Sequence, residues 1–427
     1  MFCPFLFPIK MRHLSLLTLF TLLTACPALR SQTFRISVGN PSAYARTEVV
    51  EVALQRLGHD GSAGRCTAWR VLDGEGRAVA SQVTHDGKLL FAASIAAKGR
   101  SAFTAAPGEP PNELPAVFVK VYPQRLDDIA WENDRMAYRA YGPALQRSGE
   151  RSFGYDVWVK NTSRPVVDER YRRELDPVVQ DSVRRLRKTQ PKAAKALQRS
   201  VSYHVDHGNG MDCYKVGPTL GCGTPALLTP QDRIAYPWCY QDIQVLDSGP
   251  LRITFRARHA PQEPSPLGTY TEVRTLSLDR HALLNRLTVS YTPLPHRATM
   301  AAGIVVHPDD TPAYALRPRQ GYMLYSDPTD NPRAGNGRIF TACVFPRRDV
   351  DMAYRPLPPN EQQQAKALGH LLAMRTAHGR RTTMTYWWGA AWSKAGTADM
   401  QQWERQVAQE ADRLRHPLRV KVKRLGH

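Results

Sequence analysis

Hydrophobic and polar positions alternate along most of this chain, which is the period of β-strands rather than of helices. The alternation is clear at 34–38 and 47–52, and it returns at 251–257, 272–278 and 284–291. Short runs of Val, Thr, Tyr and Phe, separated by many of the 33 prolines and 28 glycines, are typical of β-rich proteins. The pattern therefore predicts a mainly β fold of antiparallel strands.

Turn and linker signals divide this pattern into two domains. Asp73-Gly74 and Asp86-Gly87 are turn signals within the first set of strands, and the Pro-rich stretch 106–112 follows as a linker. We expect a small immunoglobulin-like β-sandwich at 31–107 and a large antiparallel supersandwich at 113–427. A mature chain of about 400 residues agrees with two domains rather than one.

Helices are expected at two places in the second domain. The segment 165–200 is a basic helical insertion, in which an amphipathic Arg- and Lys-rich pattern predicts helix over 175–197 with a break at Pro191. A terminal helix is expected at 399–415, followed by a short basic strand or tail.

The first 26 residues resemble a lipoprotein signal peptide. The basic residues Lys10 and Arg12 precede an apolar run at 14–23, which is too short to span a bilayer. The run ends in Leu-Thr-Ala-Cys at Cys26, which resembles the bacterial lipobox, where the cysteine is acylated. We expect export and a lipid anchor on Cys26, at the periplasmic face of the outer membrane. An ordinary signal peptide is the alternative.

The remaining cysteines do not form a recognisable framework. Five are left after Cys3 and Cys26, with no Cys-x-x-Cys pair among them, although export permits disulfides. We expect buried thiols, or at most one bridge among Cys213, Cys222 and Cys239. The spacing also argues against a zinc site.

The formal net charge of +20 narrows the class of ligand. Export and the absence of a nucleic-acid-binding motif argue against nucleic acid as a partner. An acidic oligosaccharide or polysaccharide would be concentrated by such a surface through electrostatic steering, and an acidic membrane surface is a second possible partner. Part of the excess charge lies in the helical insertion, where a solvated basic face needs no ligand.

The segment 203–215 is too polar for a core strand. It contains two histidines, two aspartates, two tyrosines and a lysine, and burying such groups unpaired costs several kcal/mol each. In an extended segment His204 and Asp206 would share a face, and the glycines at 208 and 210 would bring Asp212 back beside them. A carboxylate next to an imidazole suits acid–base catalysis. A hydrogen-bonded turn and a divalent metal site are the alternatives.

Three further segments carry residues that suit sugar binding. Glu132 and Asp134 share a face if the chain is extended, so they would serve either as acid and base or as a salt-bridged strand end. Asp156, Trp158 and Lys160 likewise share one face, which would serve as a stacking platform for a sugar or as part of the core. The aromatic cluster of Trp387 and Trp388 is expected to place one ring in the core and to leave another for a glycan.

Several of these motifs together resemble an exported Bacteroidetes family known as domain of unknown function 4861. They are WENDR at 131–135, GYDVW at 154–158, YHVDHG at 203–208, DCY at 212–214 and YWWG at 386–389. The resemblance covers most of the mature chain and implies a role beside polysaccharide-degrading enzymes. The stretch 246–252, followed by 272–274 and 277–279, is also similar to the supersandwich of sugar mutarotases and polysaccharide lyases, which implies a substrate class more than a reaction.

We therefore predict an exported carbohydrate-active enzyme that cleaves acidic, uronate-containing glycans by β-elimination. His204, His207 and Tyr203 would act as base and acid with Asp206 beside them, and Arg139 or Lys215 would neutralise the substrate carboxylate. The predicted substrate-binding residues are Trp131, Glu132, Asp134, Tyr155, Asp156, Trp158, Lys160, Asp212, Tyr214, Lys215, Trp387 and Trp388. A glycoside hydrolase of the same substrates, a sugar epimerase and a non-catalytic glycan-binding lipoprotein are the alternatives. No cofactor is expected, with a divalent cation as the alternative.

Overall fold

The computed structural model describes residues 32–58, 68–261, 265–294, 298–376 and 382–426. The predicted mainly β fold is confirmed, because strands form the cores of both domains. Within the described residues, no helix is both long and apolar enough to cross a membrane. Cys26 and the signal segment 1–26 lie outside these residues, so the lipid anchor stays a prediction.

The small sandwich is built from two sheets that enclose one apolar core. One sheet has the order β26 (Arg419–Arg424), β1 (Phe34–Gly39), β7 (Arg100–Pro107), β3 (Trp69–Leu72) and β4 (Ala78–Val79), and the other has the order β2 (Arg46–Ala53), β6 (Lys88–Ile95) and β5 (Ser81–Val83). Alternation decides which residues enter this core: Ile36 and Val38 of β1 are buried, whereas Arg35 is exposed. A short 3₁₀ turn, η1 (Leu54–Leu57), follows β2.

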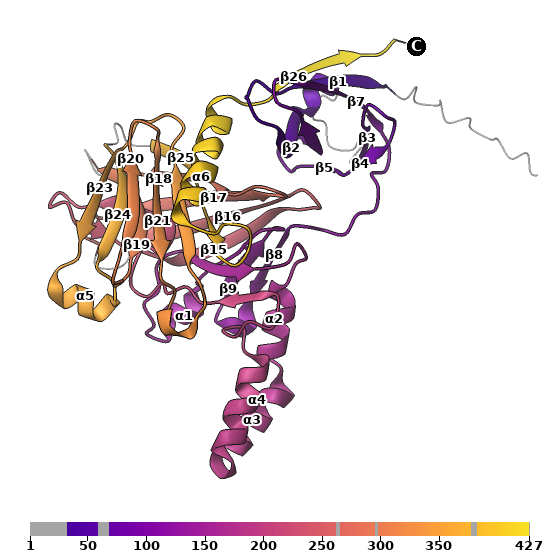
Figure 1. Ribbon diagram of the computed structural model, residues 1–427. Helices are drawn as coiled ribbons and strands as arrows, with labels where there is room; N and C mark the ends of the chain where they lie inside the picture. The colour runs from indigo at the N-terminus through magenta and orange to yellow at the C-terminus, as the bar shows by residue number, and fades with distance from the viewer. Residues whose placement is uncertain (1–31, 59–67, 262–264, 295–297, 377–381, 427) are drawn as a thin grey trace, which may run out of the picture.

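The last strand of the chain belongs to the first domain, which corrects the predicted boundary of 113–427. β26 pairs antiparallel with β1 along its whole length, from Phe34 opposite Arg424 to Gly39 opposite Arg419. Its Val420 and Val422 pack against the sandwich core. Figure 1 shows this strand, in yellow, beside the indigo β1. The sequence pattern indicates a strand there, but only a partner far away in the chain decides which sheet it completes.

An antiparallel sheet of eight strands forms the main layer of the second domain. Its order is β15 (Pro237–Ser248), β16 (Arg252–Pro261), β17 (Thr271–Asp279), β18 (Asn285–Thr292), β25 (Thr382–Trp392), β22 (Ile339–Val344), β21 (Tyr322–Asp327) and β20 (Ala313–Arg317). Ile253, Phe255 and Ala257 point into the core, whereas the alternate Arg256 and Arg258 are exposed on the outer face.

Two five-stranded sheets pack against the inner face of this layer. The first has the order β12 (Gly210–Asp212), β11 (Asp156–Lys160), β10 (Ala137–Ala140), β9 (Asp128–Glu132) and β8 (Phe118–Tyr122). The second has the order β14 (Ile234–Ala235), β13 (Cys222–Leu228), β19 (Thr299–Val306), β24 (Gly369–Thr376) and β23 (Asp351–Pro356). A bridge between Tyr155 and Gly221 joins them, with the Cys222 amide donating to the Tyr155 carbonyl at 3.0 Å. One large core lies between the layers.

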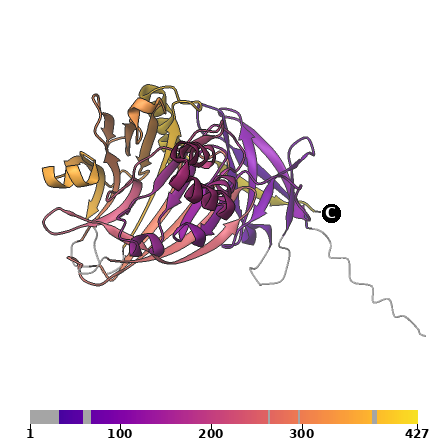
Figure 2. The same cartoon turned by 90° about the horizontal axis from the view of Figure 1, so that it is seen from below.

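The basic insertion forms three helices, α2 (Val167–Glu174), α3 (Pro177–Thr189) and α4 (Pro191–Val201). Asp176 caps α3 by accepting hydrogen bonds from the amides of Val178 and Val179, and Pro191 separates α3 from α4 as the sequence predicts. The α3–α4 hairpin projects away from the sheets (Figure 1). Seen from below, the insertion lies over the strands of the small sheet β8–β12 (Figure 2).

The other helices are short or lie at the edge of the layers. They are α1 (Pro143–Arg147), α5 (Pro359–Ala365) and α6 (Met400–Arg415), with short 3₁₀ turns η2 (Pro123–Arg125) and η3 (Pro332–Ala334). Asp399 caps α6, and the spacing of Trp403, Val407 and Ala411 buries one face against the outer side of β21 and β22.

The cysteines outside the signal segment are buried thiols where the structure describes them. Cys213, Cys222, Cys239 and Cys343 are buried and form no disulfide with one another. The prediction of buried thiols therefore holds for these four, and Cys66 lies outside the described residues.

Candidate functional site

The small sheet β8–β12 has one apolar face and one strongly polar face. Ile129, Trp131, Tyr138 and Val157 point into the main core. The alternate positions point toward helix α2, where Ala130, Ala137 and Trp158 pack with Tyr171 and Tyr203. The same face carries Asp128, Arg139, Asp156 and Asp212, which the register places on neighbouring strands. We call these four residues the carboxylate cluster.

Arg139 lies at the centre of the carboxylate cluster. Its Nη2 is 2.6 Å from Asp156 Oδ2 and 2.9 Å from Asp212 Oδ2, and its Nη1 is 3.8 Å from Asp128 Oδ2. The guanidinium also lies over the Trp158 ring, 5.0 Å from the centroid. Arg139 is only 5% exposed. Its positive charge is therefore already balanced by the protein's own carboxylates.

Burial makes two carboxyl groups of the cluster harder to ionise than a free aspartate. Burial, reinforced by Asp156, raises the pKa of Asp212 to about 7 despite the neighbouring Arg139. Burial likewise raises the pKa of Asp128 to about 6, although Arg139 and Arg125 oppose the shift. Both residues have an Oδ1 atom with no hydrogen-bond partner among the described residues. Perturbed carboxyl groups of this kind are common at functional sites.

His204 connects this buried cluster with solvent. Its Nδ1 lies 3.1 Å from the Asp212 carbonyl oxygen and 3.5 Å from Asp212 Oδ2, while about half of the imidazole is exposed. The neighbouring Tyr203 is buried and stacks on Trp158, and its hydroxyl accepts a hydrogen bond from Arg125 Nε at 3.2 Å. A proton held by Asp212 therefore has an imidazole beside it that faces the solvent.

A strained loop after β21 lies against the same segment. The Asp330 amide donates to the Cys213 carbonyl at 2.8 Å. Partial burial raises the pKa of Asp330, an effect that the nearby His204 counteracts. Thr329 has φ +71° although it is β-branched and buried. Such a conformation costs about 1–3 kcal/mol and is concentrated at functional sites. Asp330 is thus a second acidic group whose charge interacts with that of His204.

A second histidine–aspartate pair lies beside the loop. His307 Nδ1 is 2.7 Å from Asp327 Oδ2, and its Nε2 has no partner among the described residues. The Tyr214 ring lies 5.9 Å from the imidazole, and its hydroxyl is also unpaired. Both residues are buried. No sequence pattern points to this pair, or to Asp128 and Asp330, because their chain positions are far from 203–215.

Six of the predicted site residues meet at the cluster. Arg139, Asp156 and Asp212 belong to it, and Trp158, Tyr203 and His204 contact its members. The segment 203–209 is a series of turns rather than an extended strand, which corrects the predicted pairing of His204 with Asp206. Asp206 instead accepts hydrogen bonds from the amides of Gly208 and Gly210, and His207 Nε2 lies 3.0 Å from the Ser202 carbonyl.

Glu132, Asp134 and Lys160 lie outside the cluster. Glu132 pairs with Lys160 at 2.6 Å and accepts hydrogen bonds from the amides at the start of α2, so it fixes the insertion to the sheet. Asp134 pairs instead with His281 at 2.8 Å. Glu132 and Asp134 therefore have different partners and do not act together as the extended chain predicts.

Most of the remaining predicted residues are in the core. Trp131 and Trp388 are fully enclosed, and Tyr155 stacks on Trp388 with centroids 4.6 Å apart. These three rings lie between the sheets, where they stabilise the packing. Lys215 is partly exposed near Lys366, and burial together with Lys366 lowers its pKa. Trp387 points to the opposite, outer face of the large sheet. Over the described residues, no group of three or more His, Cys, Asp or Glu side chains is arranged to hold a metal ion.

Comparisons with known proteins give a family but no activity. A family model described as "Domain of unknown function (DUF4861)" matches residues 38–420. The uncharacterized protein P7 of Formosa agariphila is 23% identical over 314 residues, which are 71% of this chain and 69% of that protein.

Two solved structures are weakly similar to this chain. They are a protein in the glycosyl hydrolase family 38 from Enterococcus faecalis (TM-score 0.45, 9% identity) and an alpha-mannosidase from Enterococcus faecalis V583 (TM-score 0.42, 8% identity). Each likeness covers 92% of this chain, which spans about half the length of those proteins: 47% and 46%. At these scores neither structure supports an argument about activity.

Proposed function

The chain belongs to the DUF4861 family, whose description names no activity, and we propose from its site that it is a carbohydrate-active enzyme. The reaction we propose is cleavage of an acidic glycan by general acid–base catalysis at Asp330 and at His204, which is backed by Asp212. One observation carries the proposal: a carboxyl group with a pKa of about 7 lies against a half-exposed imidazole. Groups with a pKa near the working pH are the most effective proton-transfer catalysts.

Hydrolysis fits the site better than β-elimination. Elimination requires a cation that neutralises the substrate carboxylate, and the predicted Arg139 is buried and ion-paired with Asp156 and Asp212. Hydrolysis requires a protonated acid beside the scissile bond and a base that activates water. Asp330, with its raised pKa, suits the acid, and His204 backed by Asp212 suits the base.

The rim of the site favours an acidic substrate. Lys215 and Lys366 lie near each other and near Asp330, and their mutual repulsion contributes to the lowered pKa of Lys215. Two crowded cations of this kind gain stability when an anionic group binds between them. A uronate or sulfated sugar supplies such a group, and the net charge of +20 attracts it.

β-Elimination remains the second candidate because one observation favours it. His204 is exposed enough to reach the proton on the carbon next to the uronate carboxylate. Lys215 is available to neutralise that carboxylate in place of Arg139. The two reactions give different products. Elimination forms an unsaturated uronate that absorbs in the ultraviolet, whereas hydrolysis raises the number of reducing ends without this absorbance.

Incubation with a panel of uronate and sulfated polysaccharides tests the proposed function. We expect new reducing ends from at least one polysaccharide with the native protein, and a loss of about 100-fold or more with His204→Ala, since a general acid or base contributes about 10²–10⁴-fold. The matched control is His416→Ala, which removes an exposed histidine at the end of α6. An unchanged rate in His204→Ala would refute the assigned role.

We also propose that the protein is exported and anchored through Cys26 at the periplasmic face of the outer membrane. The apolar run and the Leu-Thr-Ala-Cys motif support this proposal. A Cys26→Ala variant should lose incorporation of labelled palmitate and move from the membrane to the soluble fraction. Labelling that persists in this variant would contradict it.

A further inference from the structure

A cavity of about 460 Å³ separates the small sandwich from the outer face of the large sheet. Strand β2 forms one wall, β16–β18 and β25 form the other, and the end of α6 closes one side. A second cavity of about 260 Å³ continues from it and shares Arg252, Ser277 and Arg286. The two cavities therefore form one groove along the junction of the domains.

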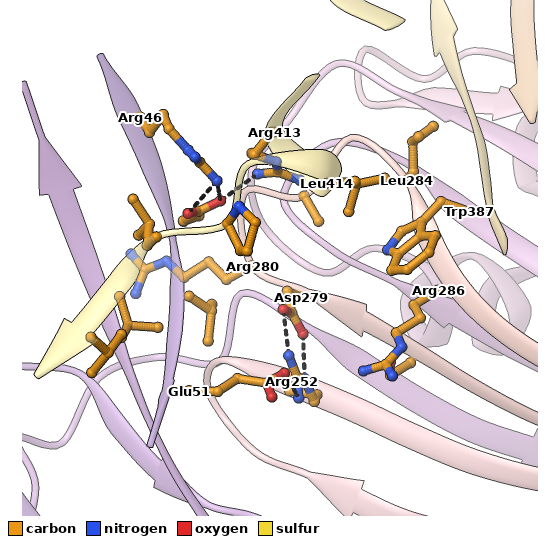
Figure 3. A pocket seen from close by; sticks show the side chains of 18 residues that line it. Arg46, Glu51, Arg252, Asp279, Arg280, Leu284, Arg286, Trp387, Arg413 and Leu414 are labelled. Atoms are coloured by element: carbon orange, nitrogen blue, oxygen red, sulfur yellow. Dashed lines mark hydrogen bonds and ion pairs between the residues drawn. The ribbon is translucent and has the colours of Figure 1, made fainter. Parts of the chain in front are cut away.

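The groove carries an excess of positive charge. Five arginines and three carboxylates line the larger cavity. Four of the arginines form ion pairs with the protein's own carboxylates. Arg252 pairs with Glu51 and Asp279, Arg280 pairs with Glu113, and Arg46 and Arg413 share Glu48. Figure 3 shows the Arg252–Asp279 pair at the centre of the cavity.

Arg286 differs from these four. It is exposed, and none of the described carboxylates pairs with it. Its guanidinium lies over the Trp387 ring, 5.8 Å from the centroid. In Figure 3 the two side chains lie together, apart from the ion pairs. A cation held by an aromatic face in an open groove is available to an anionic ligand.

The sheet next to this pair is lined with hydroxyl groups. The register places Ser277, Arg286 and Trp387 in one cross-strand row, and Thr275, Thr288 and Thr385 in the next. Thr288 and Thr385 share a hydrogen bond at 2.9 Å. A flat indole, a free guanidinium and a row of hydroxyls are the groups that stack on a sugar ring, pair with its anionic substituent and bind its hydroxyls.

We propose that this groove is a second, non-catalytic binding site for an acidic oligosaccharide, in which Trp387 stacks on a sugar ring and Arg286 pairs with its carboxylate or sulfate ester. The groove is distinct from the carboxylate cluster. Residues from the two inner sheet faces, such as Trp131 and Phe255 at 5.0 Å, pack between the two sites. The proposed site thus lies on the opposite side of the core and holds the glycan without touching His204.

Binding is measured by calorimetry in the His204→Ala background, so that turnover does not affect the result. The probes are tetragalacturonate, a sulfated carrageenan tetrasaccharide and the neutral cellotetraose. We expect saturable binding of at least one anionic probe, with affinity reduced at least tenfold by Arg286→Gln and by Trp387→Ala. The preferred anion distinguishes a uronate from a sulfate ligand. Cellotetraose should bind at least tenfold more weakly.

The control is Arg319→Ala, which removes an exposed arginine in the turn between β20 and β21, outside both cavities. It should leave affinity unchanged. Equal losses in Arg319→Ala and Arg286→Gln would show that only the overall charge matters and would overturn the proposal. Failure of both anionic probes to bind would also overturn it, as would binding that is present in the native protein and lost in His204→Ala.

Discussion

Asp212→Asn should stabilise this protein while it abolishes activity. The Asp212 carboxyl is 1% exposed, and burial and Asp156 raise its pKa from 3.8 to about 7. Each pKa unit corresponds to 1.36 kcal/mol, so the ionised carboxylate costs the folded state about 4 kcal/mol relative to the unfolded chain. Asparagine has the shape of the protonated acid and keeps an oxygen that accepts from Arg139, but it carries no charge to desolvate.

The gain from Asp212→Asn should depend on pH. Well below pH 3.8 the carboxyl is protonated in both folded and unfolded chains, so it contributes no penalty. Between pH 4 and 7 the unfolded chain loses its proton first, and the folded state becomes progressively less stable as the pH rises. The penalty reaches about 2 kcal/mol at pH 5 and its full value of about 4 kcal/mol at pH 8.

Thermal unfolding, followed by tryptophan fluorescence, measures this difference. The variant should have a higher Tm than the native protein by several degrees at pH 8, and by about half as much at pH 5. The matched control is Asp134→Asn. Burial alone would raise the pKa of Asp134, but hydrogen bonds from His281 outweigh it and lower this pKa. The ionised carboxylate therefore stabilises the folded state, so this variant should have a lower Tm at both pH values. An Asp212→Asn variant that is less stable than the native protein at pH 8, or equally stabilised at both pH values, would refute the reasoning.

Three other outcomes follow from the packing and the site. Lys160→Met should destabilise the protein by about 3–5 kcal/mol because it leaves Glu132 buried without a counterion, and the double variant with Glu132→Gln should recover part of this loss in denaturant unfolding. Gly223→Ala should lower the free energy of unfolding by about 2–4 kcal/mol, because φ is +74° and an added Cβ would lie 2.5 Å from Trp388. Gly76→Ala, which has open space around it, should lower it by about 1 kcal/mol. Glycan cleavage should persist with unchanged rate in a chelating buffer, and an activity that returns only on addition of a divalent cation would contradict the expected metal-independent reaction.

The sequence by itself determined the local structure and singled out one segment of the candidate site. Alternation defined the strands because burial of one sheet face requires it. Pro191 marked a helix boundary because it lacks an amide proton, and Asp399 marked another because its side chain caps the first turn. The segment 203–215 stood out because so many titratable groups cannot be buried without partners.

Only the tertiary structure decided which groups work together. Asp128 and Arg139 come within reach of Asp212 through strand register, and Asp330 arrives on a loop more than a hundred residues further along the chain. The pKa of Asp212 is raised because neighbouring sheets and helices exclude water, a property that no local pattern records. Trp387 and Trp388 are adjacent in sequence, yet the pleat places one in the groove and the other in the core.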